Sequence, residues 1–143
     1  MEFSDFGLAP EILRAIEEIG YQQPTDIQAE SIPLILKGKD IIGRSQTGTG
    51  KTAAFASPAV EMLDTSVSRR FIQVLILCPT RELAMQATDE IRKFAKYKEG
   101  VAVTAVYGGE AIERQILQLK RGVNVVVGTP GRIMDHMRRK TIR

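Results

Sequence analysis

The sequence is poor in the features that mark secreted, zinc-binding and membrane proteins. Of its 143 residues only Cys78 is a cysteine, so neither an internal disulfide nor a thiolate metal cage can form. Its longest aliphatic runs, such as 74–77, have about four residues, whereas a membrane helix needs about 20. No charged and then apolar signal segment opens the chain. These absences predict a cytoplasmic protein without a membrane partner.

The composition is that of one compact domain. Apolar residues make up 43% and charged residues 26% of the chain, and 12 glycines and six prolines give no low-complexity segment. Charge is uneven, because residues 1–31 carry seven acids and one base while residues 132–143 carry five bases and one acid. A basic segment permits a phosphate-bearing partner, but a solvated face is the commoner explanation, so charge does not decide function.

Apolar periodicity predicts an alternating α/β chain. Strands are expected at 40–44, 71–78, 101–107 and 123–127. Helices are expected at 10–20, 25–38, from about 51, 80–97, 110–121 and 131–139. The β-branched strands do not alternate cleanly, which is typical of a parallel sheet covered by helices on both faces.

Several details of these helices are also predicted. Thr25 and Gln28 form a capping box, Pro33 is expected to split the second helix, and Pro58 to kink or shorten the third. The helix at 110–121 is expected to turn four apolar side chains inward, those of Ile112, Ile116, Leu117 and Leu119.

The strongest local signal is a glycine-rich loop between a predicted strand and a predicted helix. It reads Ser45-Gln46-Thr47-Gly48-Thr49-Gly50-Lys51-Thr52, with Ser45 where the general phosphate-loop pattern has glycine. Glycines let backbone N–H groups face one anion, Lys51 adds a charge for the β- and γ-phosphates, and the Thr52 hydroxyl suits Mg²⁺. The alternative is a strand–helix turn that binds nothing. The pattern favours a nucleoside triphosphate with Mg²⁺.

Four further segments, in this order and spacing, resemble the DEAD-box family of ATP-dependent RNA helicases. They are 20–28 (with Phe3 seventeen residues before Gly20), 79–84, 108–109 and 129–132. The resemblance covers Phe3 to Arg132 and implies a RecA-like P-loop NTPase fold, ATP as cofactor and RNA as partner.

The resemblance also implies residue roles in ATP binding. Gln28 would read adenine with its amide, Phe3 would stack on the ring, and the Gln23 backbone would contribute. Lys51 and Thr52 would be the catalytic residues of this part, and residues 1–38 the adenine-recognition segment. From the residues alone, Gln28 as a helix cap and Phe3 as a core aromatic remain open.

The same resemblance implies a grip on the RNA backbone that is independent of base sequence. Pro and Thr follow strands at 79–80 and 129–130, the edge at which open α/β sheets bind ligands. The expected RNA-binding residues are Thr80, Arg81, Gly109, Thr129 and Arg132. The pattern by itself would allow the threonines to be N-caps and the arginines to be merely solvated.

Three other features receive no functional role. Cys78 is expected to be a small core residue, His136 a surface side chain, and 138–140 a solvated helix end.

Parts of the family pattern are absent from the 143 residues. The only Asp-Glu pair is Asp89-Glu90, inside a predicted helix, so the family's Asp-Glu-Ala-Asp motif is missing, as is a second RecA-like domain. We therefore expect the front part of domain 1 of a helicase, inactive alone and prone to self-association. A non-enzymatic ATP or RNA clamp and a DNA-directed helicase are the alternatives.

Overall fold

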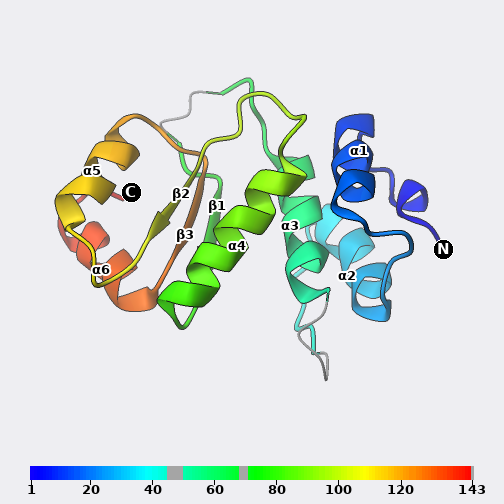
Figure 1. Cartoon of the computed structure of the whole chain (residues 1–143), viewed down its shortest axis with the longest axis horizontal. Helices are drawn as coiled ribbons and strands as arrows, with labels where there is room; N and C mark the ends of the chain where they lie inside the picture. Colours follow the sequence, from blue (N-terminus) through cyan, green and yellow to red (C-terminus); the bar gives the residue numbers. More distant parts are fainter. Residues whose placement is uncertain (45–49, 68–70, 143) are drawn as a thin grey trace. The chain divides into compact units, whose positions relative to one another are not determined.

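The computed structural model describes residues 1–44, 50–67 and 71–142. Figure 1 shows its elements in chain order. They are η1 (Phe3–Phe6), α1 (Pro10–Ile19), α2 (Asp26–Leu36), α3 (Lys51–Met62), β1 (Val74–Leu77), α4 (Arg81–Phe94), β2 (Val103–Val106), α5 (Ile112–Lys120), β3 (Val125–Gly128) and α6 (Pro130–Arg138). No helix among the described residues is both long and apolar enough to cross a membrane.

Contacts within the chain group it into two compact units, a division that the sequence pattern did not indicate. The first unit holds Met1–Met62 and Glu90–Glu99, and the second holds Leu63–Asp89 and Gly100–Arg143. Helix α4 contributes residues to both units.

The first unit is built from helices that pack through their buried sides. In α1, Pro10 occupies the first turn, Ile12 and Ile16 are buried, and Gly20 ends the helix with a φ of 108°. That positive φ suits glycine, which has no Cβ to clash. Helix α2 packs against α3, and the capping box at its start is present as predicted.

The prediction that Pro33 splits the second helix is wrong, and Pro58 does not end the third helix. Helix α2 runs through Pro33 to Leu36, and α3 runs four residues beyond Pro58 to Met62. Each proline removes only one backbone hydrogen bond, and the next turns are intact, as the bond from Lys37 N–H to the Pro33 carbonyl shows (3.2 Å). Packing of the buried faces of α2 and α3 keeps both helices continuous.

The predicted strand at 40–44 is not formed. These residues have no regular secondary structure, and Ile42 is 95% exposed. A strand needs a neighbour to pair with, and the described residues of the first unit contain no strand at all.

The second unit holds a three-stranded parallel sheet in the order β1–β3–β2. After β1 the chain forms β2 at the opposite edge of the sheet, and it then returns to form β3 between the two. Because parallel crossovers are right-handed, this reversal puts α4 and α5 on opposite faces of the sheet. Figure 1 shows the start of α4 on one side of the strands and α5 and α6 together on the other. All four residues of β3 are therefore buried.

The core of this unit lies between the sheet and the α5–α6 side. Val106, Val126 and Ile133 form its centre, joined by Val123. The prediction for α5 is wrong at one position, because Leu117 is 59% exposed while the polar Gln115 is 1% exposed. The inward face of α5 therefore includes the polar Gln115 and excludes the apolar Leu117.

Candidate functional site

The nucleotide loop is described at its helical end only. Ser45, Gln46, Thr47, Gly48 and Thr49 lie outside the described residues. Gly50 has a φ of 86° and precedes α3, which begins at Lys51. The first bond of α3 runs from Ala54 N–H to the Gly50 carbonyl, so the N–H groups of the preceding residues are not used within the helix. Such a helix start suits an anion.

Gln28 joins the start of α2 to this loop. Its Oε1 accepts a hydrogen bond from Thr25 N–H (2.9 Å), and its Nε2 donates to the Gly50 carbonyl (3.2 Å). A Cβ on Gly50 would lie 2.9 Å from both Gln28 Nε2 and Thr25 Oγ1, so only glycine fits there. The capping role left open for Gln28 is confirmed, and the adenine-reading role stays a prediction.

Phe3 is buried and meets two aromatic neighbours edge-on. Its ring centroid lies 6.0 Å from that of Phe6 and 6.2 Å from that of Tyr21. A hollow of about 500 Å³ is lined by Phe3, Tyr21 and Gln22, among others. Gln23, which follows Gln22 in the sequence, is exposed. Phe3 therefore has the core contacts of a structural aromatic and borders a space that a flat ring could enter.

The described residues supply little for a metal ion. Thr52 is half-buried at the start of α3, and no group of three or more acidic, histidine or cysteine side chains that could hold a metal occurs in the described residues. Mg²⁺ is commonly held by one or two carboxylates together with substrate phosphates. The Thr52 hydroxyl thus fits as one ligand of a phosphate-bound ion.

The second unit gathers the other predicted site residues at one edge of its sheet. Leu77 of β1 and Val106 of β2 both align with Gly128 of β3, so the three parallel strands end together. Cys78 N–H bonds to the Gly128 carbonyl and Thr129 N–H to the Val106 carbonyl, extending this alignment past the strands (2.9 and 3.1 Å). The residues that follow the strands are Thr80 with Arg81, Gly109, and Thr129 with Arg132.

Arg81 and Gly109 lie against each other at this edge. The Arg81 guanidinium carbon is 4.9 Å from the centroid of the Tyr107 ring, and a Cβ on Gly109 would lie 3.6 Å from Arg81 Nη1. Burial and a hydrogen bond to Glu110 raise the pKa of Tyr107, so its phenol stays neutral beside the arginine. The cation–π contact restrains an exposed cation.

The two threonines differ in how they begin their helices. Thr80 Oγ1 accepts a bond from Leu83 N–H (3.2 Å), which confirms its N-cap role. Thr129 stands at the N-cap position of α6, but its side chain makes no capping bond. The Thr129 hydroxyl is thus not engaged by α6 and suits a ligand at the sheet edge.

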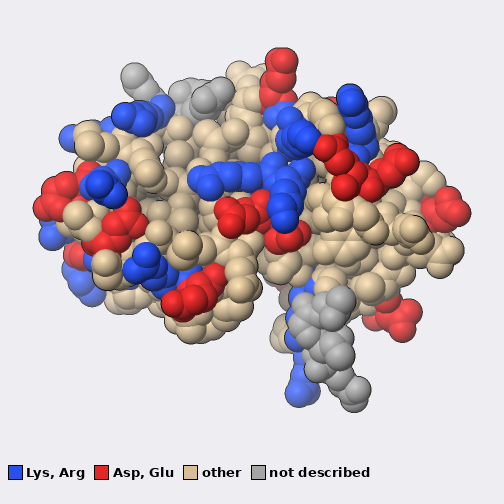
Figure 2. Space-filling model, viewed as in Figure 1, with Lys and Arg blue, Asp and Glu red and all other residues tan. Residues whose placement is uncertain are grey.

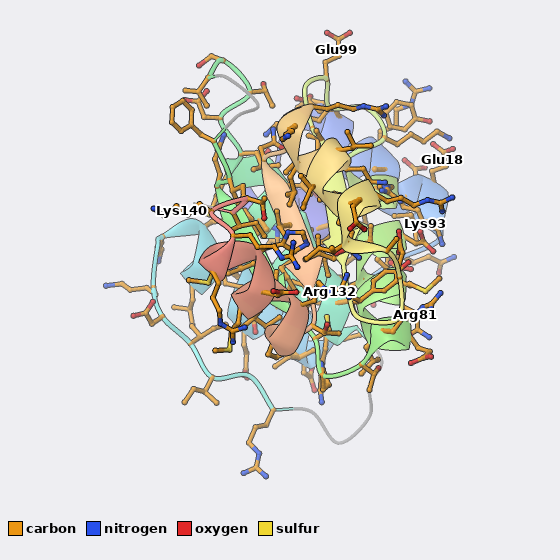
Figure 3. All side chains as sticks on the ribbon, turned by 90° about the vertical axis from the view of Figure 1, so that its left-hand side faces the viewer. Glu18, Arg81, Lys93, Glu99, Arg132 and Lys140 are labelled. Carbon is orange, nitrogen blue, oxygen red and sulfur yellow. The ribbon has the colours of Figure 1, made fainter. Side chains whose placement is uncertain are left out.

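Arg132 is half-buried and held toward α5. Its Nη1 donates to the Glu110 carbonyl (3.0 Å) and to Gln115 Oε1 (3.1 Å). Figure 3 shows the Arg132 side chain between the ribbons of α6 and α5. This arginine is not the freely solvated side chain that the pattern alone would allow.

The sequence interpretation missed two polar residues beside Arg132. His136 was expected at the surface but is fully buried, and Gln115 was not considered. Helical spacing was the available signal, since Gln115 follows Ile112 by three residues and His136 follows Ile133 by three. Cys78 is half-buried rather than in the core, and burial raises the pKa of its thiol.

Acidic side chains accompany many of the surface cations. Figure 2 shows basic and acidic side chains interspersed on the visible face. Lys93 pairs with Glu90, Lys96 with Glu18, and Arg139 with Asp135. The run 138–140 is exposed, as expected for a solvated helix end. The visible face therefore has no continuous patch of one charge sign.

A parallel sheet with helices on both faces, together with a glycine-rich sequence that ends at the start of α3, is typical of a RecA-like P-loop nucleotide-binding fold. The family model DEAD/DEAH box helicase matches residues 25–143. This chain belongs to the DEAD/DEAH box helicase family.

Two similar curated proteins come from bacteria. The chain is 50% identical over 141 residues to the DEAD-box ATP-dependent RNA helicase CshA of Geobacillus kaustophilus, covering 99% of this chain and 30% of that protein. It is 48% identical to the protein of the same name from Bacillus cereus, covering 99% and 26%. The chain thus spans less than a third of the length of these relatives.

Solved structures are similar over nearly the whole chain. A DEAD box protein from the hyperthermophile Methanococcus jannaschii matches with a TM-score of 0.92 and 44% identity, covering 100% of this chain and 38% of that one. A hypothetical ATP-dependent RNA helicase from Sulfolobus tokodaii matches with a TM-score of 0.81 and 38% identity, covering 92% and 37%.

Proposed function

We propose that this chain is the ATP- and RNA-binding front part of an ATP-dependent RNA helicase that couples ATP hydrolysis to local unwinding of RNA duplexes. Family membership supports the class of enzyme. The observation that carries the RNA-binding part is the common edge of the three parallel strands, where Arg81 lies beside Gly109 and Arg132 bonds to the carbonyl of Glu110. Backbone N–H groups and arginines at such an edge hold phosphates without reading bases.

ATP would occupy the start of α3. Lys51 would bind the β- and γ-phosphates, the Thr52 hydroxyl would ligate Mg²⁺, and Gln28 would hold the Gly50 end of the loop while reading adenine. Bound Mg²⁺ neutralises phosphate charge during phosphoryl transfer. The 143 residues contain no Asp-Glu-Ala-Asp sequence, so we propose that they hydrolyse no ATP without further residues. A cytoplasmic location is part of the proposal.

The test is RNA-stimulated phosphate release by the full-length protein that contains this chain. Wild-type protein should release phosphate from ATP faster with RNA than with single-stranded DNA, and Lys51→Ala should abolish turnover because the phosphates lose their cation. ATP or RNA binding without turnover would instead indicate a non-enzymatic clamp, and equal stimulation by DNA would indicate a DNA-directed helicase. Near-normal turnover by Lys51→Ala would overturn the loop assignment.

A further inference from the structure

Arg132 is fixed on one side by two acceptors. Both bonds that it makes in the described part of the chain use Nη1, one to the Glu110 carbonyl and one to Gln115 Oε1. A guanidinium carries five N–H donors, so Nε and Nη2 keep theirs for a ligand. An arginine held in this way loses less side-chain freedom on binding phosphate than a free one does.

The orientation of the Gln115 amide is set by its other bonds. Its Nε2 donates to the Tyr107 carbonyl (2.9 Å), which places Oε1 toward α6. That oxygen meets both Arg132 Nη1 (3.1 Å) and His136 Nε2 (2.9 Å). Gln115 is 1% exposed, so an amide turned the other way would leave its groups facing the wrong partners in a buried site.

His136 lies one turn after Arg132 in α6 and is the second residue of that helix to contact Gln115 Oε1. Because Gln115 Oε1 can only accept, His136 Nε2 carries the proton of the neutral ring. Thr141 Oγ1 lies 2.7 Å from His136 Nδ1 and 3.1 Å from the His136 carbonyl oxygen, so these two acceptors share its one hydroxyl proton. Thr141 is brought back by Lys140, whose φ is 60°, and by the bond from Thr141 N–H to the His136 carbonyl (2.9 Å). Figure 3 marks Lys140 at this turn.

We propose that Gln115 and His136 are positioning residues for RNA binding: together they hold the Arg132 guanidinium where it contacts a backbone phosphate. This inference rests on the proposed RNA-binding role of Arg132. Thr141 contacts His136, His136 contacts Gln115, and Gln115 contacts Arg132, so each residue orients the next across the two helices α5 and α6. None of the three residues behind Arg132 needs to touch RNA itself.

Burial of polar groups could instead serve only to specify the packing of α5 on α6. The two accounts differ in what happens once Arg132 is removed. A positioning residue has nothing left to position, so its substitution should add no further loss of RNA affinity. A residue that serves only packing should act the same with and without Arg132.

The experiment measures binding of a uniform single-stranded RNA to the full-length protein over a range of salt concentrations. The variants are Arg132→Ala, Gln115→Met and the two combined. We expect Arg132→Ala to weaken binding and to reduce the logarithmic salt slope by about 0.7, the value for one single-strand phosphate contact. We expect Gln115→Met to weaken binding about ten-fold, equivalent to about 1.4 kcal/mol, and the combined variant to match Arg132→Ala within about two-fold.

The matched control is Gln118→Met on the same helix. Gln118 accepts a hydrogen bond from Thr104 Oγ1, so this variant loses a glutamine side-chain bond on the same helix but leaves Arg132 and His136 untouched. It should bind RNA as the wild type does. If Gln118→Met and Gln115→Met weaken binding equally, or if the losses from Gln115→Met and Arg132→Ala simply add, the positioning role is overturned.

The outcomes separate this inference from the proposed function. No loss of RNA binding in Arg132→Ala would overturn the RNA-binding role of Arg132 and with it the inference. A loss in Arg132→Ala without one in Gln115→Met would overturn the inference alone.

A second measurement needs no substitution at Gln115. Nitrogen NMR of the His136 ring should show the neutral Nε2–H form at neutral pH, and its shifts should change in Arg132→Ala because the two share Gln115 Oε1. A neutral ring protonated at Nδ1 instead, or nitrogen chemical shifts that do not change in Arg132→Ala, would overturn the positioning role.

Discussion

Among the single residues, Gln28 has a side-chain amide that makes two separate hydrogen bonds. It caps α2 through Thr25 and binds the Gly50 carbonyl at the end of the nucleotide loop. An amide has two N–H donors and an oxygen with two lone pairs, and the described bonds use one of each. The remaining donor and lone pair are what recognition of adenine would require.

We predict that Gln28→Ala in the full-length protein lowers the preference for ATP over GTP. Adenine donates from N6, where guanine has an acceptor, so loss of the amide should remove about 1–3 kcal/mol of discrimination, as for an amide that reads adenine in DNA. The measurement is kcat/KM for each nucleotide under saturating RNA. A wild-type protein that already uses GTP as well as ATP would contradict the adenine-reading role.

His136 predicts a pH dependence of stability. Burial lowers its pKa below the ordinary 6.5, and Arg132 and Arg139 act in the same direction while Asp135 opposes them. At pH values between 6.5 and the lower pKa of His136 in the folded chain, the unfolded chain binds more protons than the folded one. The contribution of His136 to the free energy of unfolding is therefore complete above 6.5 and falls as the pH is lowered through that window.

The measurement is the urea midpoint from about pH 7.5 to about pH 5 for wild type and His136→Asn. The wild type should lose stability on acidification more steeply than the variant, whose amide does not titrate. Equal pH dependence in the two proteins would show that other groups account for it.

At the scale of the element, β3 depends on a glycine that the strand pattern did not single out. A Cβ on Gly128 would lie 2.6 Å from the Val106 carbonyl oxygen and 2.7 Å from Ile133 Cδ1. The close approach lets β2 and α6 pack on the end of β3, where the sheet edge places Thr129. No such contact surrounds Gly131 in α6, where a Cβ would meet open space.

We therefore predict opposite effects of the same substitution three residues apart. Gly128→Ala should lower the free energy of unfolding by about 1–3 kcal/mol through overpacking. Gly131→Ala should leave it unchanged or raise it by up to about 1 kcal/mol, because alanine favours the helix. Urea unfolding of both variants at low protein concentration tests the pair, and equal effects would contradict the packing argument.

For the molecule as a whole, the important strand is β1, which lies at one edge of the sheet formed by the described residues. It pairs only with β3 among the described strands, and Leu75 and Leu77 are exposed on one of its faces. Exposed apolar edge strands recruit other chains. We predict that the isolated 143-residue chain self-associates in a concentration-dependent way.

Sedimentation over a dilution series tests this prediction. Leu75→Lys should shift the chain toward monomer, because a charge on an edge strand opposes pairing. Leu117→Lys is the matched control, since Leu117 is equally an exposed leucine but lies on α5. A wild-type chain that stays monomeric at every concentration would contradict the prediction, as would an equal effect of both substitutions.

The sequence by itself determined the elements whose signals are local. Caps and helix ends depend on residues within one turn, so the capping box of α2, the end of α1 at Gly20 and the Thr80 cap of α4 were all predictable. The order of the family motifs likewise indicated the fold and the strand ends at which the predicted site residues lie.

Tertiary structure alone decided the rest, because those outcomes depend on partners distant in sequence. Packing carried α2 and α3 through Pro33 and Pro58, and residues 40–44 formed no strand despite the two isoleucines at 41–42. Spacing on one helix could not reveal that Gln115 and His136 would find hydrogen-bond partners on each other's helices. Burial of a polar side chain is favourable only when such partners exist, and only the folded chain supplies them.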